Sequence, residues 1–205
     1  MKLVLLIILS MIFSSLTLVI VADVVLLGFA KPMIQFHLKK KSVMFRNKKR
    51  FEIQTQMQCA GFSSAYVLRD YGHDVSGMEL YDAIPHKRAD GSVYPTDIPK
   101  ILNKYGHRAT YHIGNLIALK NCLSEEKHVI ALIRYETRLP YLHFIAIVGY
   151  DEDYIYVAES LKEKINCNDS KYYNRKISVK EFKKLWNTSM LKMPFHRNTF
   201  FAINQ

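Results

Sequence analysis

The sequence predicts an α+β domain preceded by one long apolar helix. Two observations carry this prediction. Residues 3–22 contain no charged side chain, and about 20 helical residues suffice to cross the hydrocarbon core of a bilayer. Beyond this stretch, helix-type patterns dominate up to about residue 106, and segments rich in Ile, Val and Tyr dominate afterwards. Helices and strands that are segregated along the chain are typical of α+β folds.

The charge pattern divides the chain into three parts: a transmembrane anchor over 1–30, a basic linker over 31–50 and a folded domain over 51–205. The linker carries eight Lys and Arg and no acidic residue. We expect it to contact anionic lipid while residues 3–30 lie in the membrane. No nucleic-acid partner is expected, because no recognition motif accompanies the charge.

The side of the membrane stays open between two interpretations. The positive-inside rule favours a cytoplasmic domain on a single-pass anchor, because eight positive charges follow the apolar segment. Alternatively, the apolar segment is a secretory signal cleaved near the small residues Gly28 and Ala30, which would place the domain outside the cell.

The elements of the helical half follow from apolar periodicity and end signals. An extended segment at 51–54 comes first, and a loop at 85–95 contains the turn pair Asp90-Gly91. We expect helices over 60–70 closed by Gly72, over 78–83, and from Thr96 to a stop at Gly106.

In the second half the apolar pattern changes to that of strands. We expect strands over 109–113, 128–135, 142–150, 154–159 and 199–204. Two helices interrupt them, one over 116–123 and one that runs from the capping box Ser178-x-x-Glu181 to Trp186.

Three cysteines, Cys59, Cys122 and Cys167, occur without a C-x-x-C pair, so we expect no metal site and no cofactor. In an exported domain Cys122 and Cys167 could form a disulfide and leave Cys59 free. In the cytoplasm all three would be thiols.

Cys59 is the candidate nucleophile. It comes directly before the helix predicted over 60–70, where unpaired backbone N–H groups and the positive end of the helix dipole stabilise a thiolate. The alternative is a buried, inert thiol, which is the commoner role of a single cysteine.

Among eight histidines, His128 and His143 begin apolar strands, and His143 is the candidate base. The stretch after it predicts a hairpin that turns at 151–153. With a three-residue turn, paired residue numbers sum to 304, and Glu159 lies diagonally across from His143 on the same face. A carboxylate at this position can fix the imidazole, whereas a turn one residue longer or shorter would move Glu159 to the other face. His128 has no such partner in this pattern.

Gln54 is the candidate oxyanion donor, since it lies five residues before Cys59 and its amide could act together with the Cys59 N–H. Gln56 is the alternative donor. Both could also be solvated side chains of a polar stretch.

These residues carry a family resemblance. The segment QTQMQCAGFSSAYVLRDYG resembles the nucleophile segment of the bacteriocin-leader-processing, double-glycine peptidases, often labelled peptidase C39-like. The segment LHFIAIVGYDEDYIYVAES resembles their second signature, in which a histidine opens a strand and a carboxylate ends the next. The resemblance covers about residues 51–160. It implies a papain-like fold and a thiol peptidase acting on a peptide or protein, with Cys59, His143, Glu159 and Gln54 in the site.

Three positions depart from the family pattern. Gln58 and Ala60 stand where relatives usually have Asp or Asn and Gly, and Glu159-Ser160 stands where they usually have Asp-Pro. No G-x-x-x-x-G-K-[ST] motif is present in these residues, so we do not expect the transporter-fused form. A catalytically inactive peptide-binding or immunity-type module of the same fold is the alternative function. A basic surface-binding protein that depends only on residues 31–50 is a third hypothesis.

Overall fold

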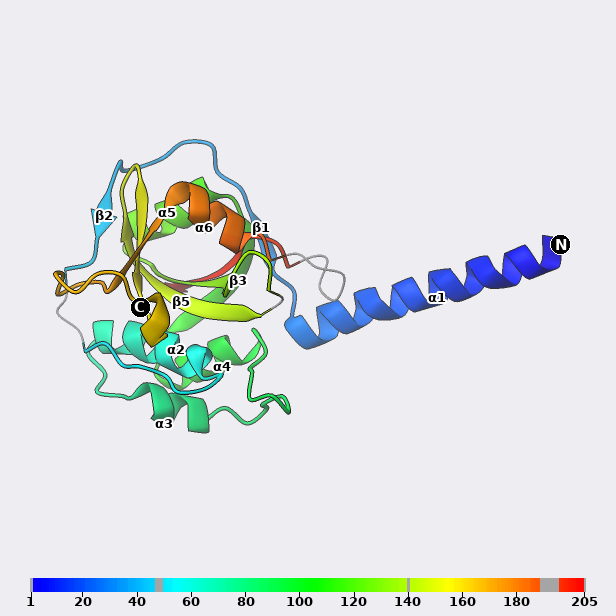
Figure 1. Ribbon diagram of the computed structural model, residues 1–205, viewed down its shortest axis with the longest axis horizontal. Helices are drawn as coiled ribbons and strands as arrows, with labels where there is room; N and C mark the ends of the chain where they lie inside the picture. Colours follow the sequence, from blue (N-terminus) through cyan, green and yellow to red (C-terminus); the bar gives the residue numbers. More distant parts are fainter. Residues whose placement is uncertain (1, 47–49, 140, 189–195, 205) are drawn as a thin grey trace.

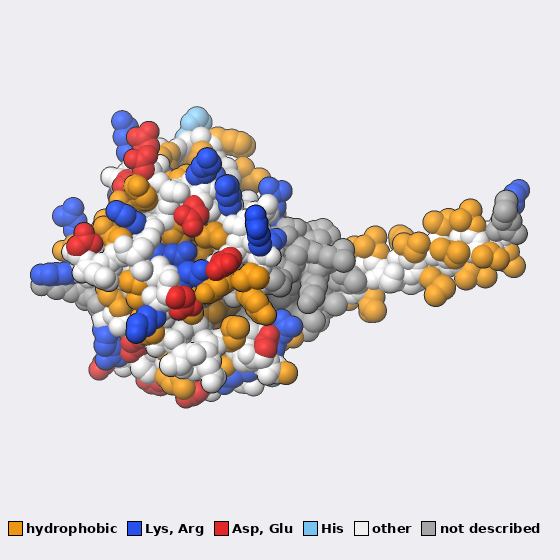
Figure 2. All heavy atoms as spheres, viewed as in Figure 1, with side chains coloured by type: hydrophobic (Ala, Val, Ile, Leu, Met, Phe, Trp, Pro, Cys, Tyr) orange, Lys and Arg blue, Asp and Glu red, His pale blue; other side chains and the backbone are white. Residues whose placement is uncertain are grey.

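The computed structural model describes residues 2–46, 50–139, 141–188 and 196–204. It begins with α1 (Lys2–Leu27), which extends away from the rest of the chain (Figure 1). Apolar side chains cover the part of α1 that is drawn in colour, whereas Lys, Arg, Asp and Glu are mixed over the visible face of the domain (Figure 2). Within the described ranges, no helix satisfies both the length and the hydropathy needed to cross a membrane.

One mixed sheet organises the domain, in the order β1-β3-β8-β4-β5-β6-β7, with β2 paired to β5. Among the strands of the described residues, β1 and β3 pair in parallel and all other pairs are antiparallel. The strands are β1 (Lys31–Met33), β2 (Val43–Met44), β3 (Arg108–Gly114), β4 (His128–Arg134), β5 (Leu142–Tyr150), β6 (Tyr154–Ala158), β7 (Arg175–Ser178) and β8 (Thr199–Asn204).

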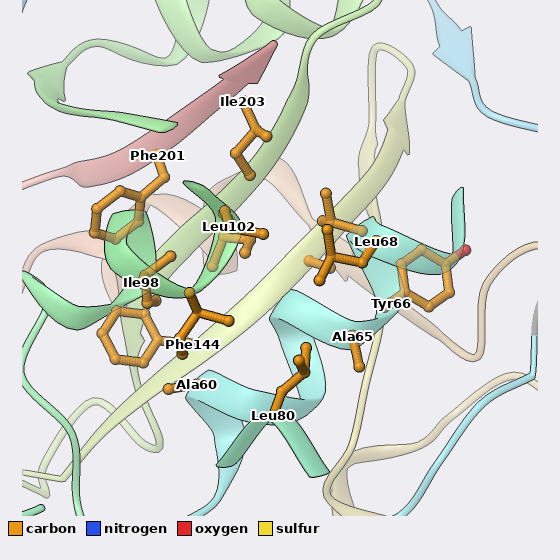
Figure 3. Packing of buried hydrophobic residues seen from close by; sticks show 14 of the residues in the cluster. Ala60, Ala65, Tyr66, Leu68, Leu80, Ile98, Leu102, Phe144, Phe201 and Ile203 are labelled. Atoms are coloured by element: carbon orange, nitrogen blue, oxygen red, sulfur yellow. The ribbon is translucent and has the colours of Figure 1, made fainter. Parts of the chain in front are cut away.

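Helices cover both faces of this sheet (Figure 1). On one side lie α2 (Cys59–Asp70), α3 (Gly77–Asp82) and α4 (Asp97–Lys104); on the other lie α5 (Leu116–Ser124) and α6 (Val179–Trp186). Each face has its own apolar core. Figure 3 shows the first, where Leu68 of α2 and Leu102 of α4 pack with Phe144 of β5 and Phe201 of β8. The α+β class predicted from the sequence is therefore confirmed, whereas a transmembrane helix is not.

The basic stretch at 31–50, assigned to a linker by its charge, contributes two strands to the sheet. Lys31–Met33 pair with β3, and Val43–Met44 pair with the end of β5. Gly149 permits the second pairing, since a Cβ at this position would lie 2.4 Å from the Val43 carbonyl oxygen. Residues 47–49 lie outside the described part of this stretch.

In the β5–β6 hairpin, the predicted pairing, in which residue numbers sum to 304, holds far from the turn but not next to it. Ile147 pairs with Val157, which satisfies the predicted sum, but Tyr150 pairs with Ile155 because the turn is one residue longer than expected. A bulge at Val148 absorbs the additional residue. It also reverses the alternation of side chains, so Tyr150 joins Ile147 in the core on the α5–α6 side.

Candidate active site

Cys59 is the first residue of α2, so its thiol lies at the amino end of a 12-residue helix. The loop before it is held by Gln58, whose buried side-chain oxygen accepts the N–H groups of Thr55 at 3.2 Å and Gln56 at 3.4 Å. The thiol is half-buried. Its own backbone N–H belongs to the first turn, where a helix provides no internal acceptor. A sulfur and a hydrogen-bond donor therefore lie together at the start of α2.

His143, the second residue of β5, is buried against Glu159, which directly follows β6. Its Nε2 lies 2.7 Å from Oε1 of Glu159. An ionised carboxylate only accepts hydrogen bonds, so Nε2 carries the proton. Cys59 and His143 line the same cleft, and the Cys59 side chain is among the groups that raise the pKa of His143, so the thiol lies near the imidazole. Nδ1 is the ring nitrogen that Glu159 leaves available to it. The diagonal placement predicted for Glu159 and His143 thus brings a carboxylate, an imidazole and a thiol into one row.

Glu159 is held by more than the imidazole. Its Oε1 accepts the N–H groups of Ser160 and Leu161, each at 2.8 Å, and its Oε2 accepts Arg175 Nη1 at 2.6 Å. The Asn174 side chain binds the Glu159 backbone. Its Oδ1 accepts the Glu159 N–H at 2.7 Å, and its Nδ2 donates to the Glu159 carbonyl at 2.8 Å. The carboxylate therefore has little freedom to turn away from the imidazole.

Arg175 and Asn174 are the site residues that the sequence did not predict. Arg175 is the first residue of β7, a strand of four residues that was not expected either. In the sequence it lies in a basic carboxy-terminal stretch of Lys and Arg, and its burial depends on the pairing of β7 with β6. No local signal distinguishes it from a solvated arginine.

The electrostatics of the pair favour the ionised forms. Burial by itself would lower the pKa of His143, but the Glu159 carboxylate and the Cys59 side chain raise it to about 9. Burial would raise the pKa of Glu159, but the charges of His143 and Arg175 and the surrounding hydrogen bonds lower it to about 2. At neutral pH the site therefore holds an imidazolium next to a carboxylate. A protonated imidazole beside a thiol stabilises the thiolate.

Gln54 lies in the loop that leads to Cys59 and is buried. Its backbone N–H donates to the Ser160 carbonyl at 2.9 Å, and its Oε1 accepts the Ser160 hydroxyl at 2.6 Å. These two contacts fix the orientation of the amide. Nε2 donates to the Gln56 carbonyl at 2.6 Å and has a second N–H available. Gln56, the alternative donor, has an exposed side chain.

A cleft of about 530 Å³ opens onto these residues, a size typical of ligand pockets. Gln54, Cys59 and His143 all line it. The remaining lining is mostly apolar or aromatic, with two carboxylates: Thr55, Gln56, Met57, Asp90, Tyr135, Tyr141, Leu142, Leu161 and Glu163. The thiol therefore faces a space that can accept a substrate, with apolar walls around it.

His128, expected to lack a carboxylate partner, hydrogen-bonds with Asp70. This second imidazole–carboxylate pair is not part of the cleft. Asp70 is the last residue of α2 and Cys59 the first, so the helix separates them by about 16 Å. His143 is thus the histidine that the fold brings to the thiol.

All three cysteines are free, so the possible disulfide between Cys122 and Cys167 is not formed. Cys122 is buried, and burial raises its thiol pKa to about 11. Among the described residues, no group of three or more His, Cys, Asp or Glu side chains is placed to hold a metal ion.

Comparison with known proteins gives a family match and several matches to solved structures. The model of the Peptidase C39-like family matches residues 42–190, well over half of the chain. No protein with a curated description matches the sequence.

The structural matches have low sequence identity and therefore show the fold alone. A structure described as a C39-like peptidase from Bacillus anthracis has 15% identity and a TM-score of 0.58, and the match covers 81% of this chain and 99% of that one. The peptidase domain of Streptococcus ComA, a bifunctional ABC transporter involved in quorum sensing, has 13% identity and a TM-score of 0.52. That match covers 75% of this chain and 94% of the ComA domain. A double-glycine-motif protease of an AMS/PCAT transporter, in complex with the leader peptide, has 16% identity and a TM-score of 0.46. That match covers 80% of this chain and 98% of the protease.

Proposed function

The chain belongs to the Peptidase C39-like family, and from this premise we propose that it is a cysteine peptidase with Cys59 as its nucleophile. His143 acts as general acid and general base, and Glu159 fixes the imidazole. Gln54 and the Cys59 N–H bind the oxyanion. The substrate is a peptide or protein segment that lies in the cleft beside the thiol.

In the first half of the reaction the Cys59 thiolate attacks the scissile carbonyl carbon, and a C–S bond forms. The carbonyl oxygen becomes an oxyanion, which accepts hydrogen bonds from the Cys59 N–H and the Gln54 amide. A donor of this kind contributes about 3–4 kcal/mol to the stability of the transition state. As the C–N bond breaks, the His143 imidazolium gives its proton to the leaving amine.

The second half regenerates the thiolate. Neutral His143 takes a proton from water, and the hydroxide attacks the thioester carbon. The C–S bond then breaks, the peptide leaves as a carboxylic acid, and the thiolate–imidazolium pair is restored. Throughout, the ion pair between Arg175 and Glu159 keeps the carboxylate turned toward the imidazole.

The meeting of Cys59 and His143 in one cleft, with the imidazole buried against Glu159, is the observation that carries this proposal. A catalytically inactive module of the same fold predicts that the thiol and the imidazole lie apart. Their shared place in the cleft, and the effect of Cys59 on the pKa of His143, favour the peptidase instead. Glu159, which replaces the aspartate usual in the family, reaches the imidazole at 2.7 Å.

The first test is the reactivity of the three thiols in the folded chain. We expect iodoacetamide at neutral pH to alkylate Cys59 at least ten times faster than Cys122, because only Cys59 lies beside an imidazolium. Peptide mapping by mass spectrometry gives the rate at each site. Equal rates at Cys59 and Cys122 would count against a stabilised thiolate.

The second test is peptide hydrolysis. The full chain is incubated with a mixture of defined peptides, and new termini are detected by mass spectrometry. We expect Cys59→Ala to abolish cleavage, whereas Cys122→Ala, a matched change at a thiol outside the cleft, retains it. Cleavage that survives Cys59→Ala would refute the assignment of the nucleophile.

We further propose that residues 3–22 tether the domain to a membrane as a single pass and that residues 31–50 contact anionic lipid. The support is the uncharged run in the first segment and the eight Lys and Arg of the second. The charge rule favours a cytoplasmic domain. Retention of the chain in membranes after alkaline carbonate extraction tests the tether, and protease protection in sealed vesicles tests the side.

A further inference from the structure

Residues 34–41, here called the strap, run along the margin of the domain from β1 to β2 (Figure 1). Two asparagines of the α5 region, the partly buried Asn115 and the buried Asn121, hold the strap by its backbone. Asn115 Nδ2 donates to the carbonyl of Gln35 at 2.6 Å, and Asn121 Oδ1 accepts the N–H of Lys39 at 2.8 Å. Chain segments about 80 residues apart in the sequence are thereby fixed to each other.

The clamped strap presents alternate side chains to solvent. Ile34 is 63% exposed, Phe36 is 80% exposed and Leu38 is 42% exposed. These three positions alternate with the residues whose backbones contact the asparagines. The outcome is a row of three large apolar side chains that no described part of the domain covers, held in place by the hydrogen bonds of Asn115 and Asn121.

Positive charge surrounds this apolar row. Lys31 precedes it, and Lys40 and Lys41 follow it, with no acidic residue anywhere in 31–50. Lys39, between them, forms an ion pair with Glu125. Apolar side chains flanked by lysines are typical of segments that lie in the interface of an anionic bilayer. A second copy of this chain fits the row less well, because it would bring the same positive charges together.

The position of the strap agrees with this partner. Ile34 follows the last residue of α1, Leu27, by seven residues, which span at most about 25 Å. If α1 lies in a bilayer, the strap is therefore always within reach of the same surface. Peptide binding is a poor alternative, because the catalytic cleft is lined by other residues.

We infer that the strap is a bilayer-docking element, in which Ile34, Phe36 and Leu38 insert into the interface and the flanking lysines contact anionic headgroups. The inference rests on the proposed membrane tether. It adds that the domain is held against the surface by a second, rigid contact and does not swing freely on α1. The cleft would then be held at a fixed orientation to the membrane surface.

Tryptophan fluorescence of the full chain tests this inference. The variants I34W and F36W are reconstituted into vesicles of phosphatidylglycerol and phosphatidylcholine that carry brominated acyl chains. M78W is the matched control, because Met78 is also apolar and exposed but lies on α3, at the opposite margin of the molecule (Figure 1). The native Trp186 is buried, and its signal is subtracted with the unmodified chain.

We expect the added tryptophan of I34W and F36W to emit at shorter wavelength and to be quenched severalfold more strongly than that of M78W. Quenching equal to that of M78W would overturn the inference. A blue shift without quenching would also overturn it, because the strap would then be covered by protein. Flotation of the vesicles separates the two proposals: a chain that does not float refutes the tether, whereas a floating chain with unquenched reporters refutes the strap alone.

Discussion

Replacing Glu159 by Gln removes the negative charge next to His143 while keeping the shape of the side chain. In the native site the carboxylate is a principal cause of the raised pKa of His143, about 9. Without it, burial favours the neutral imidazole, and we expect this pKa to fall to 6.5 or below. At pH 7.5 the protonated fraction of His143 would then drop from about 0.97 to about 0.1.

The assay is the rate at which iodoacetamide alkylates Cys59 in the folded chain. We expect Glu159→Gln to slow this rate about tenfold at pH 7.5, because fewer molecules hold an imidazolium beside the sulfur. The measurement needs no knowledge of the substrate.

Glu152→Gln is the matched control, since Glu152 lies in the exposed turn of the same hairpin. It makes the same chemical change and should leave the alkylation rate at Cys59 unaltered. The reasoning is refuted if Glu159→Gln stays folded, as judged by its thermal unfolding curve, and labels Cys59 within twofold of the unmodified chain at pH 7.5.

Three further predictions concern stability. Arg175→Met leaves the Glu159 carboxylate with one buried counter-charge, so we expect the free energy of unfolding to fall by about 3 kcal/mol in urea titrations, with partial rescue by Arg175→Lys. Gly61→Ala places a Cβ 2.5 Å from the backbone oxygen of Gly77, so the melting temperature should drop by an amount equivalent to about 1–3 kcal/mol. Gly72→Ala is the comparison, because the space around Gly72 is open and the substitution meets only backbone strain. The ion pair of His143 contributes stability that is fully present below pH 6.5 and is lost as pH rises through about 9; we expect about 3 kcal/mol less stability at pH 10 than at pH 7, and a much smaller loss in Glu159→Gln.

The sequence pointed to the residues that meet in the candidate site because each has a local signal. Cys59 precedes an apolar helix with a glycine stop, and that helix forms one residue earlier than expected, with Cys59 as its first residue. His143 and Glu159 are related by a hairpin, so simple register arithmetic brings them together. The arithmetic assumed a turn that is one residue too short, and it gave the right pairing at the site because the bulge at Val148 compensates.

The residues that sequence reasoning missed depend on contacts between distant parts of the chain. β1, β2 and β7 have two to four residues each, too few to show a strand period, and they form because longer strands provide their partners. Arg175 looks like any basic surface residue until β7 pairs with β6. Charge alone indicated a linker at 31–50, whereas Asn115 and Asn121 hold much of it against the domain.

The place of β8 in the sheet has a consequence for the order of folding. Residues 199–204 are synthesised after every other described strand, yet they lie between β3 and β4 and hydrogen-bond with both. During translation β3 and β4 therefore lack the strand that joins them until these six residues have left the ribosome. The part of the sheet that carries His143, on β5, can pair locally with β4 and β6, but it joins the β1–β3 side only at the end.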